Sequence, residues 1–66
     1  MTRNEAYDAK ELENCRQYSE ANNITVWVLT NGNDVKYTEF ERRAESLIAR
    51  GFAIKYIIKG GVITAA

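Results

Sequence analysis

Residues 37–58, YTEFERRAESLIARGFAIKYII, constrain the fold most, because a helix, a stop and a strand follow one another there. Thr38 and Glu41 have the spacing of a capping box, which predicts that the helix begins at Thr38. Gly51 predicts where it ends, since glycine adopts the left-handed conformation most easily. Phe52 is then placed to pack back onto the last turn. The predicted apolar stripe of this helix is Phe40, Ala44, Leu47 and Ile48.

A second helix is predicted near the N-terminus, over residues 3–21. Thr2 and Glu5 form another capping box at its start, and Asn22 and Asn23 are suited to end it. Its apolar stripe is thin and consists of Tyr7, Leu12, Cys15, Tyr18 and Ala21. We therefore expect this helix to be the least firmly anchored element.

The segment ITVWVLT, residues 24–30, has the β-branched and aromatic composition of a strand. Asn31-Gly32 follows it, a dipeptide typical of a two-residue type I′ hairpin turn. Such a turn would place Val26 opposite Tyr37 on a short second strand. Gly60-Gly61 predicts another tight turn, after which residues 62–66 return as the last strand.

The expected order is therefore α-β-β-α-β-β, a single small α+β domain over residues 1–66 with a mainly antiparallel sheet. The central helix is expected on the face with Ile24, Val26, Val28, Val35, Tyr37, Phe52, Ile54, Tyr56 and Ile58. The opposite face, with Trp27, Leu29, Ala53, Ile57 and Ile63, is also apolar. The N-terminal helix, a second copy of the chain or a partner protein has to cover it.

Composition argues against catalysis and against metal or cofactor binding. The chain of 66 residues has no histidine and one cysteine, which excludes an internal disulfide and a Cys/His metal site. Cys15 lies on an apolar stripe, where a lone cysteine is usually a small core residue. No apolar run approaches the length of a membrane span, so we expect a cytoplasmic protein without membrane contact.

We therefore expect a non-enzymatic protein-binding module that acts by steric block of a partner protein. In size and composition the chain resembles the small accessory and inhibitor proteins that phages and mobile elements encode. A homodimer with Trp27 at or beside the contact is expected as well. The alternative is a small nucleic-acid-binding module, because most basic side chains lie in the second half of the chain. The candidate binding residues are Trp27, Leu29, Arg42, Arg43, Arg50, Lys55, Ile57 and Lys59.

Overall fold

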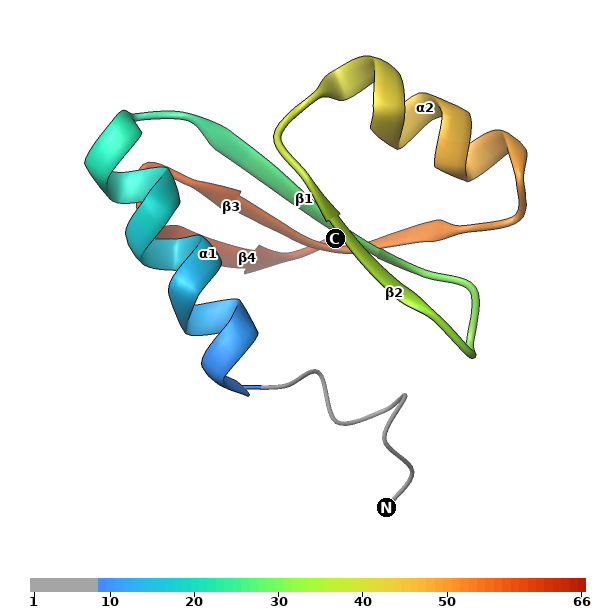
Figure 1. Cartoon of the computed structure of the whole chain (residues 1–66), viewed down its shortest axis with the longest axis horizontal. Coiled ribbons are helices and arrows are strands. Elements are labelled where there is room, and N and C mark those ends of the chain that lie inside the picture. The colour runs from blue at the N-terminus through green and yellow to red at the C-terminus, as the bar shows by residue number, and fades with distance from the viewer. Residues whose placement is uncertain (1–8) are drawn as a thin grey trace.

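The computed structural model describes residues 9–66 and confirms a small α+β domain with the expected order of elements (Figure 1). The elements are α1 (Ala9–Asn22), β1 (Thr25–Thr30), β2 (Val35–Thr38), α2 (Glu41–Ala49), β3 (Ala53–Lys59) and β4 (Val62–Ala65). The strands form one antiparallel sheet in the order β2-β1-β3-β4. The predicted capping box at Thr2 lies outside the described residues.

Strand β1 is apolar on both faces, and one helix packs on each (Figure 1). Val26 and Val28 are buried on the face that α1 covers, in a core completed by Ile58. Leu29 is buried on the other face, against Ala44 and Leu47 of α2. The molecule thus has three layers, with the sheet between two helices.

The prediction that the central helix covers the Val26 face is therefore wrong, because α1 lies there. A β-bulge explains part of the difference. Val28 of β1 pairs with Tyr56 of β3, but the next residue, Leu29, pairs with Ile54. Lys55 is therefore an extra residue of β3 without a partner in β1. A bulge reverses the alternation of faces along its strand. Ile54 therefore lies on the α2 face with Leu29. Without the bulge it would lie on the α1 face with Tyr56.

The start of α2 also differs from the prediction. Phe40 is the N-cap residue, and no side chain caps the helix. Thr38 is still paired with Trp27 in the sheet, and its hydroxyl accepts a hydrogen bond from the Phe40 amide at 3.0 Å. The helix consequently begins after Phe40. Of the predicted stripe, Phe40 is 63% exposed and Ile48 is 47% exposed.

The end of α2 is confirmed. Gly51 has a φ of 100°, and its amide donates to the Ile48 carbonyl at 3.0 Å. The Phe52 amide donates to the Leu47 carbonyl at 3.0 Å, which completes a Schellman motif. Phe52 packs against the core that includes Leu47, as its position predicts. Asn23, with a φ of 52°, provides the left-handed residue that was expected after α1.

The first hairpin has a different register from the one predicted. Val28, not Val26, lies opposite Tyr37, and four residues connect Thr30 to Val35. The Asn31 side chain accounts for the longer loop, since its Oδ1 accepts from the amides of Asn33 and Asp34, at 2.9 and 2.7 Å. These local bonds replace the type I′ turn, whose first residue would need a positive φ.

The expected tight turn is found at Gly60-Gly61. Both glycines have positive φ, 56° and 84°, as a type I′ turn requires. Lys59 pairs with Val62 on either side of them, so β3 and β4 form a hairpin with a two-residue loop.

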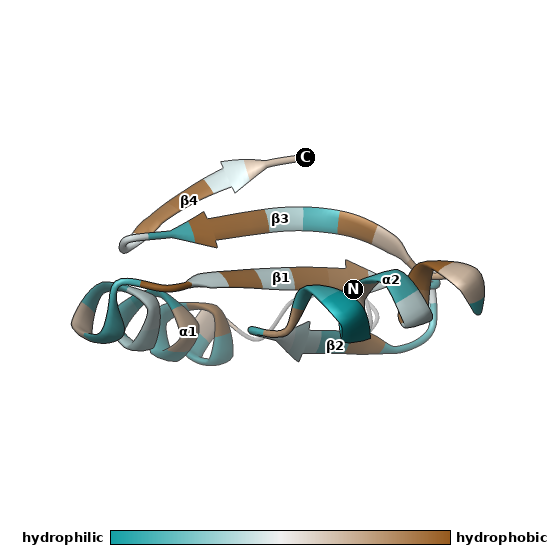
Figure 2. Ribbon diagram, turned by 90° about the horizontal axis from the view of Figure 1, so that it is seen from above, coloured by the Kyte–Doolittle hydropathy of each residue, from teal (hydrophilic) through white to brown (hydrophobic). Residues whose placement is uncertain are grey.

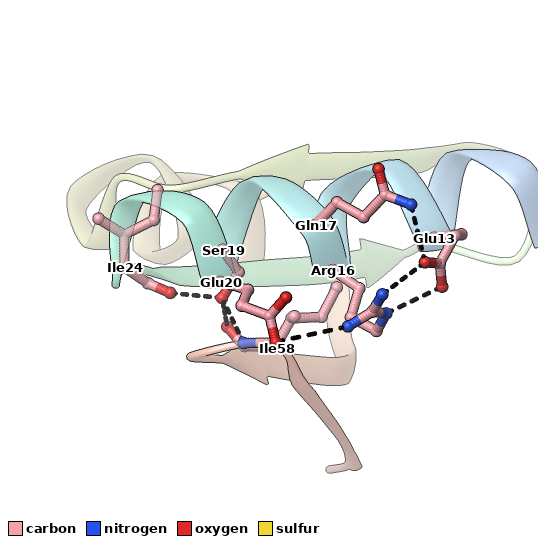
Figure 3. A network of polar contacts seen from close by, with 8 residues as sticks. Glu13, Arg16, Gln17, Ser19, Glu20, Ile24 and Ile58 are labelled. Carbon is pink, nitrogen blue, oxygen red and sulfur yellow. Dashed lines mark hydrogen bonds and ion pairs between the residues drawn. The ribbon is translucent and has the colours of Figure 1, made fainter.

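Ser19 connects α1 to the sheet and is the fully buried polar residue of the described chain (Figure 3). Its hydroxyl donates to the Ile24 carbonyl at 2.6 Å, and the Ile58 carbonyl lies 3.4 Å away. The same oxygen accepts from the Gly61 amide at 3.3 Å. One side chain thus links the end of α1, the start of β1 and the β3–β4 turn.

Replacing Ser19 by alanine should lower the free energy of unfolding by about 1–3 kcal/mol, because buried polar groups lose their partner. Urea denaturation followed by circular dichroism measures the change. Ser46→Ala, at an exposed position of α2, is the matched control and should have a small effect. Equal stability of Ser19→Ala and the wild type would contradict a structural role for this hydroxyl.

Replacing Gly51 by valine should destabilise the protein by about 1–2 kcal/mol, because a β-branched residue resists a positive φ. No heavy atom lies within 4 Å of a Cβ added there, so the cost would come from the backbone and not from a clash. Gly51→Asn should cost less, since asparagine tolerates this region better. Equal urea midpoints for Gly51→Val and Gly51→Asn would rule out this explanation.

Candidate protein-binding surface

The sheet has an uncovered area on its α2 face. In antiparallel pairs, opposite residues project to the same face. Trp27, Ile57 and Thr64 form one cross-strand row on this face, and Thr25, Lys59 and Val62 form the next. Lys55, the extra residue at the bulge of β3, is exposed two residues before Ile57. We call these residues the sheet patch: Thr25, Trp27, Lys55, Ile57, Lys59, Val62 and Thr64.

The arrangement of the helices leaves the sheet patch open. α1 packs on the opposite face. α2 packs over the end of the sheet where Leu29, Phe52 and Ile54 lie. In Figure 2 no helix lies over the α2 face of β4 or of the adjoining part of β3. Val62 is 63% exposed, and Trp27 and Ile57 are half-buried. An apolar surface of this kind on a folded domain is typical of an interaction site.

Lysines make the rim of the sheet patch positive. Lys55 and Lys59 are exposed, and Ile57 lies between them along β3. Neither ammonium group forms an ion pair with any residue of the described chain. The sheet patch contains no carboxylate. It therefore combines an apolar centre with an unbalanced positive charge, which is complementary to an apolar surface that carries acidic groups.

The structure brings together four of the predicted binding residues: Trp27, Lys55, Ile57 and Lys59. Leu29 does not belong with them, because it is 0% exposed beneath α2 and cannot contact a partner. Trp27 lies at the border of the sheet patch, since it also packs against the core under α2. The indole is thus shared between the core and the surface.

Sequence reasoning missed Val62, the most exposed apolar side chain of the sheet patch. The signal for it was present, since a two-residue Gly60-Gly61 turn places Val62 directly opposite Lys59. It also missed Phe40 and Ile48, which the helical periodicity assigned to the core. They are exposed because α2 begins late and packs on the sheet through Ala44 and Leu47.

The predicted arginines lie elsewhere, on or directly after α2. Arg42, Arg43 and Arg50 are exposed and form no ion pair within residues 9–66. Tyr37 and Tyr56, whose rings are of the kind that stack on nucleic-acid bases, pack with the core on the α1 face. The structure therefore separates the arginines from these tyrosines, whereas a surface for single strands combines cations with stacking rings.

The α1 face has a shallow groove of about 300 Å³, lined by Asn14, Cys15, Tyr18, Val26, Tyr37, Thr38 and Glu39. The Tyr18 hydroxyl donates to Glu39 at 3.0 Å across it, and this bond raises the pKa of Tyr18. Burial and, to a lesser extent, the Glu11 charge raise the pKa of the Cys15 thiol. Since a thiolate is the reactive form, Cys15 is poorly suited to nucleophilic chemistry.

Charged side chains on α1 form a local network (Figure 3). Arg16 donates to both Glu13 oxygens, at 2.9 and 2.7 Å, and Gln17 donates to one of them at 3.0 Å. The hydrogen bonds from Arg16 and then Gln17 lower the pKa of Glu13 from 4.5 to about 2. Arg16 also lies 3.9 Å from a Glu20 oxygen.

Comparisons with protein-family models, curated proteins and solved structures found no match to this chain. Neither helix of residues 9–66 has the length and apolar character of a membrane span. Within the same residues, no group of three or more cysteine and carboxylate side chains comes together as a metal site.

The Glu13 network predicts a pH effect. Because folding lowers this pKa, Glu13 contributes stability above pH 4.5, and that contribution is lost as the pH falls from 4.5 to about 2. Salt should weaken the effect, since the side chains are exposed. Urea titrations across this pH range should show a smaller loss for Glu13→Gln than for the wild type. Glu45→Gln on α2 is the control and should behave like the wild type.

Proposed function

We propose that this protein is a non-enzymatic protein-binding module that uses the sheet patch to occupy and block a surface of its partner. The observation that carries the proposal is an open sheet face on which Trp27, Ile57 and Val62 lie near Lys55 and Lys59, neither of which forms an ion pair within residues 9–66. Tryptophan and large apolar side chains commonly provide most of the binding energy at protein interfaces. The partner surface that fits is apolar with an acidic rim.

The chemistry of the chain also favours binding over catalysis. It has no histidine to serve as a general base, and the pKa of its cysteine is raised. A module that acts sterically, like small inhibitors from phages and mobile elements, needs only a rigid surface. The three layers around the sheet provide one, because the strands of the sheet patch are held from behind by α1.

The proposal can be tested with variants that change only the sheet patch. Lysate proteins retained by the immobilised wild type are identified, and their affinity is then measured with purified partner. Lys55→Glu/Lys59→Glu should weaken binding at least about tenfold, equivalent to about 1.4 kcal/mol, because it reverses the charge of the rim. Lys36→Glu, an exposed lysine of β2 outside the sheet patch, is the matched control and should bind nearly as the wild type does.

Ile57→Asp tests the apolar centre and should also abolish retention of the partner. Its circular dichroism spectrum and urea midpoint establish that the variant folds. Equal binding by the wild type and both sheet-patch variants would refute the proposal.

The alternative, a nucleic-acid-binding module, predicts a different pattern. Binding to oligonucleotides would weaken steeply with salt, since counterions are released. It would be lost in Arg42→Glu/Arg43→Glu and kept in Ile57→Asp. That result would replace the sheet patch by the α2 arginines as the functional surface.

A further inference from the structure

Strand β4 forms an outer edge of the sheet, and its hydrogen-bond pattern shows which groups are turned outward. The Ala66 amide donates to the Lys55 carbonyl at 3.0 Å. In an antiparallel ladder, alternate residues direct their backbone groups to the same neighbour. Thr64 and Val62 therefore face β3 with their amides and carbonyls. Ile63 and Ala65 direct theirs away from the sheet.

No protein group of residues 9–66 pairs with this outer edge. The sheet ends at β4 in the order of the strands, and no backbone bond connects the outward groups of Ile63 or Ala65 to another segment. Figure 2 shows β4 as the outermost strand, with no helix or loop along its free side. The edge is thus available for another strand.

The sequence of β4 carries no charge or proline that would block strand pairing at this edge. Natural sheets block their edges with charged residues, proline or bulges. β4 reads VITA, without a charge or proline, and pairs with β3 in regular register. The other edge differs, since β2 carries the exposed Lys36 at its centre. Of the two edges, β4 is the one suited to strand pairing.

We propose that two copies of this chain pair through their β4 strands, antiparallel and around a twofold axis, to form a continuous eight-stranded sheet. The backbone amide and carbonyl of Ile63 bond to those of Ala65 in the second copy, and Ala65 bonds in the same way to Ile63 of the second copy. Four hydrogen bonds thus form across the axis. Thr64 faces its own equivalent on the axis. This interface extends beyond the proposed function and does not depend on it.

The absence of charge on β4 permits a second copy as the occupant. A symmetric contact places each charge near its own equivalent, so a charged edge would repel itself. β4 is uncharged, and the nearest lysines, Lys55 and Lys59, lie on β3, one strand away from the contact. A twofold axis perpendicular to the sheet keeps both α2 helices on one side. The two sheet patches then become neighbours on one continuous face, because Val62 and Thr64 belong to both regions.

Sedimentation equilibrium from micromolar to millimolar concentration tests the assembly. The wild type should dimerise, and Ala65→Pro should raise the dissociation constant at least about tenfold, because proline removes an outward amide. Ala65→Thr keeps the amide and is the matched control, which should dimerise like the wild type. Ile57→Asp should also dimerise, so that failure of this interface is distinguished from failure of the proposed function.

Nuclear magnetic resonance tests the register without any variant. In the proposed dimer, Thr64 and its equivalent form a non-hydrogen-bonded pair with Cα atoms about 4.5 Å apart. An isotope-filtered experiment on mixed labelled and unlabelled chains should show contact between their α-protons. A monomer at millimolar concentration would overturn the proposal. So would a dimer that lacks this contact or is unaffected by Ala65→Pro.

Discussion

The rest of the structure depends on one constraint, which is that β1 is apolar on both faces. Val26 and Val28 project to one side of the sheet, and Leu29 projects to the other. Each face left in water would cost about 25 cal/mol per Å² of apolar area. A single helix covers one face only, so the chain needs two. The other strands then flank β1, with β2 on one side and β3 on the other.

The two helices are short and reach the sheet differently. α1 is fixed at its C-terminal end, where Ser19 bonds to the start of β1 and to the β3–β4 turn. α2 is fixed by its connections to β2 and β3 and covers the opposite end of the sheet. The part of the α2 face that remains open is therefore a consequence of where the helices are anchored. The sheet patch and the free edge of β4 lie next to each other in this region.

How well the sequence predicts each feature depends on how local its cause is. Gly51 and Phe52 form the expected Schellman motif because all its bonds lie within one turn of the chain. The Gly60-Gly61 turn is predicted for the same reason. The loop after β1 is not predicted correctly, because Asn31 can either enter a two-residue turn or accept hydrogen bonds through its side chain. Its side chain accepts from the amides of Asn33 and Asp34, and these bonds replace the two-residue turn.

The candidate surface shows the same division. The sequence by itself determined the order of the elements, the two-faced character of β1 and the presence of Trp27, Ile57 and Lys59 on one face. These follow from alternation along strands and from local turn chemistry. Only the tertiary structure decided which helix covers which face, and the bulge at Lys55 contributes to this because it reverses the alternation within β3. The tertiary structure also buried Leu29 and exposed Val62, since burial depends on where a distant helix packs.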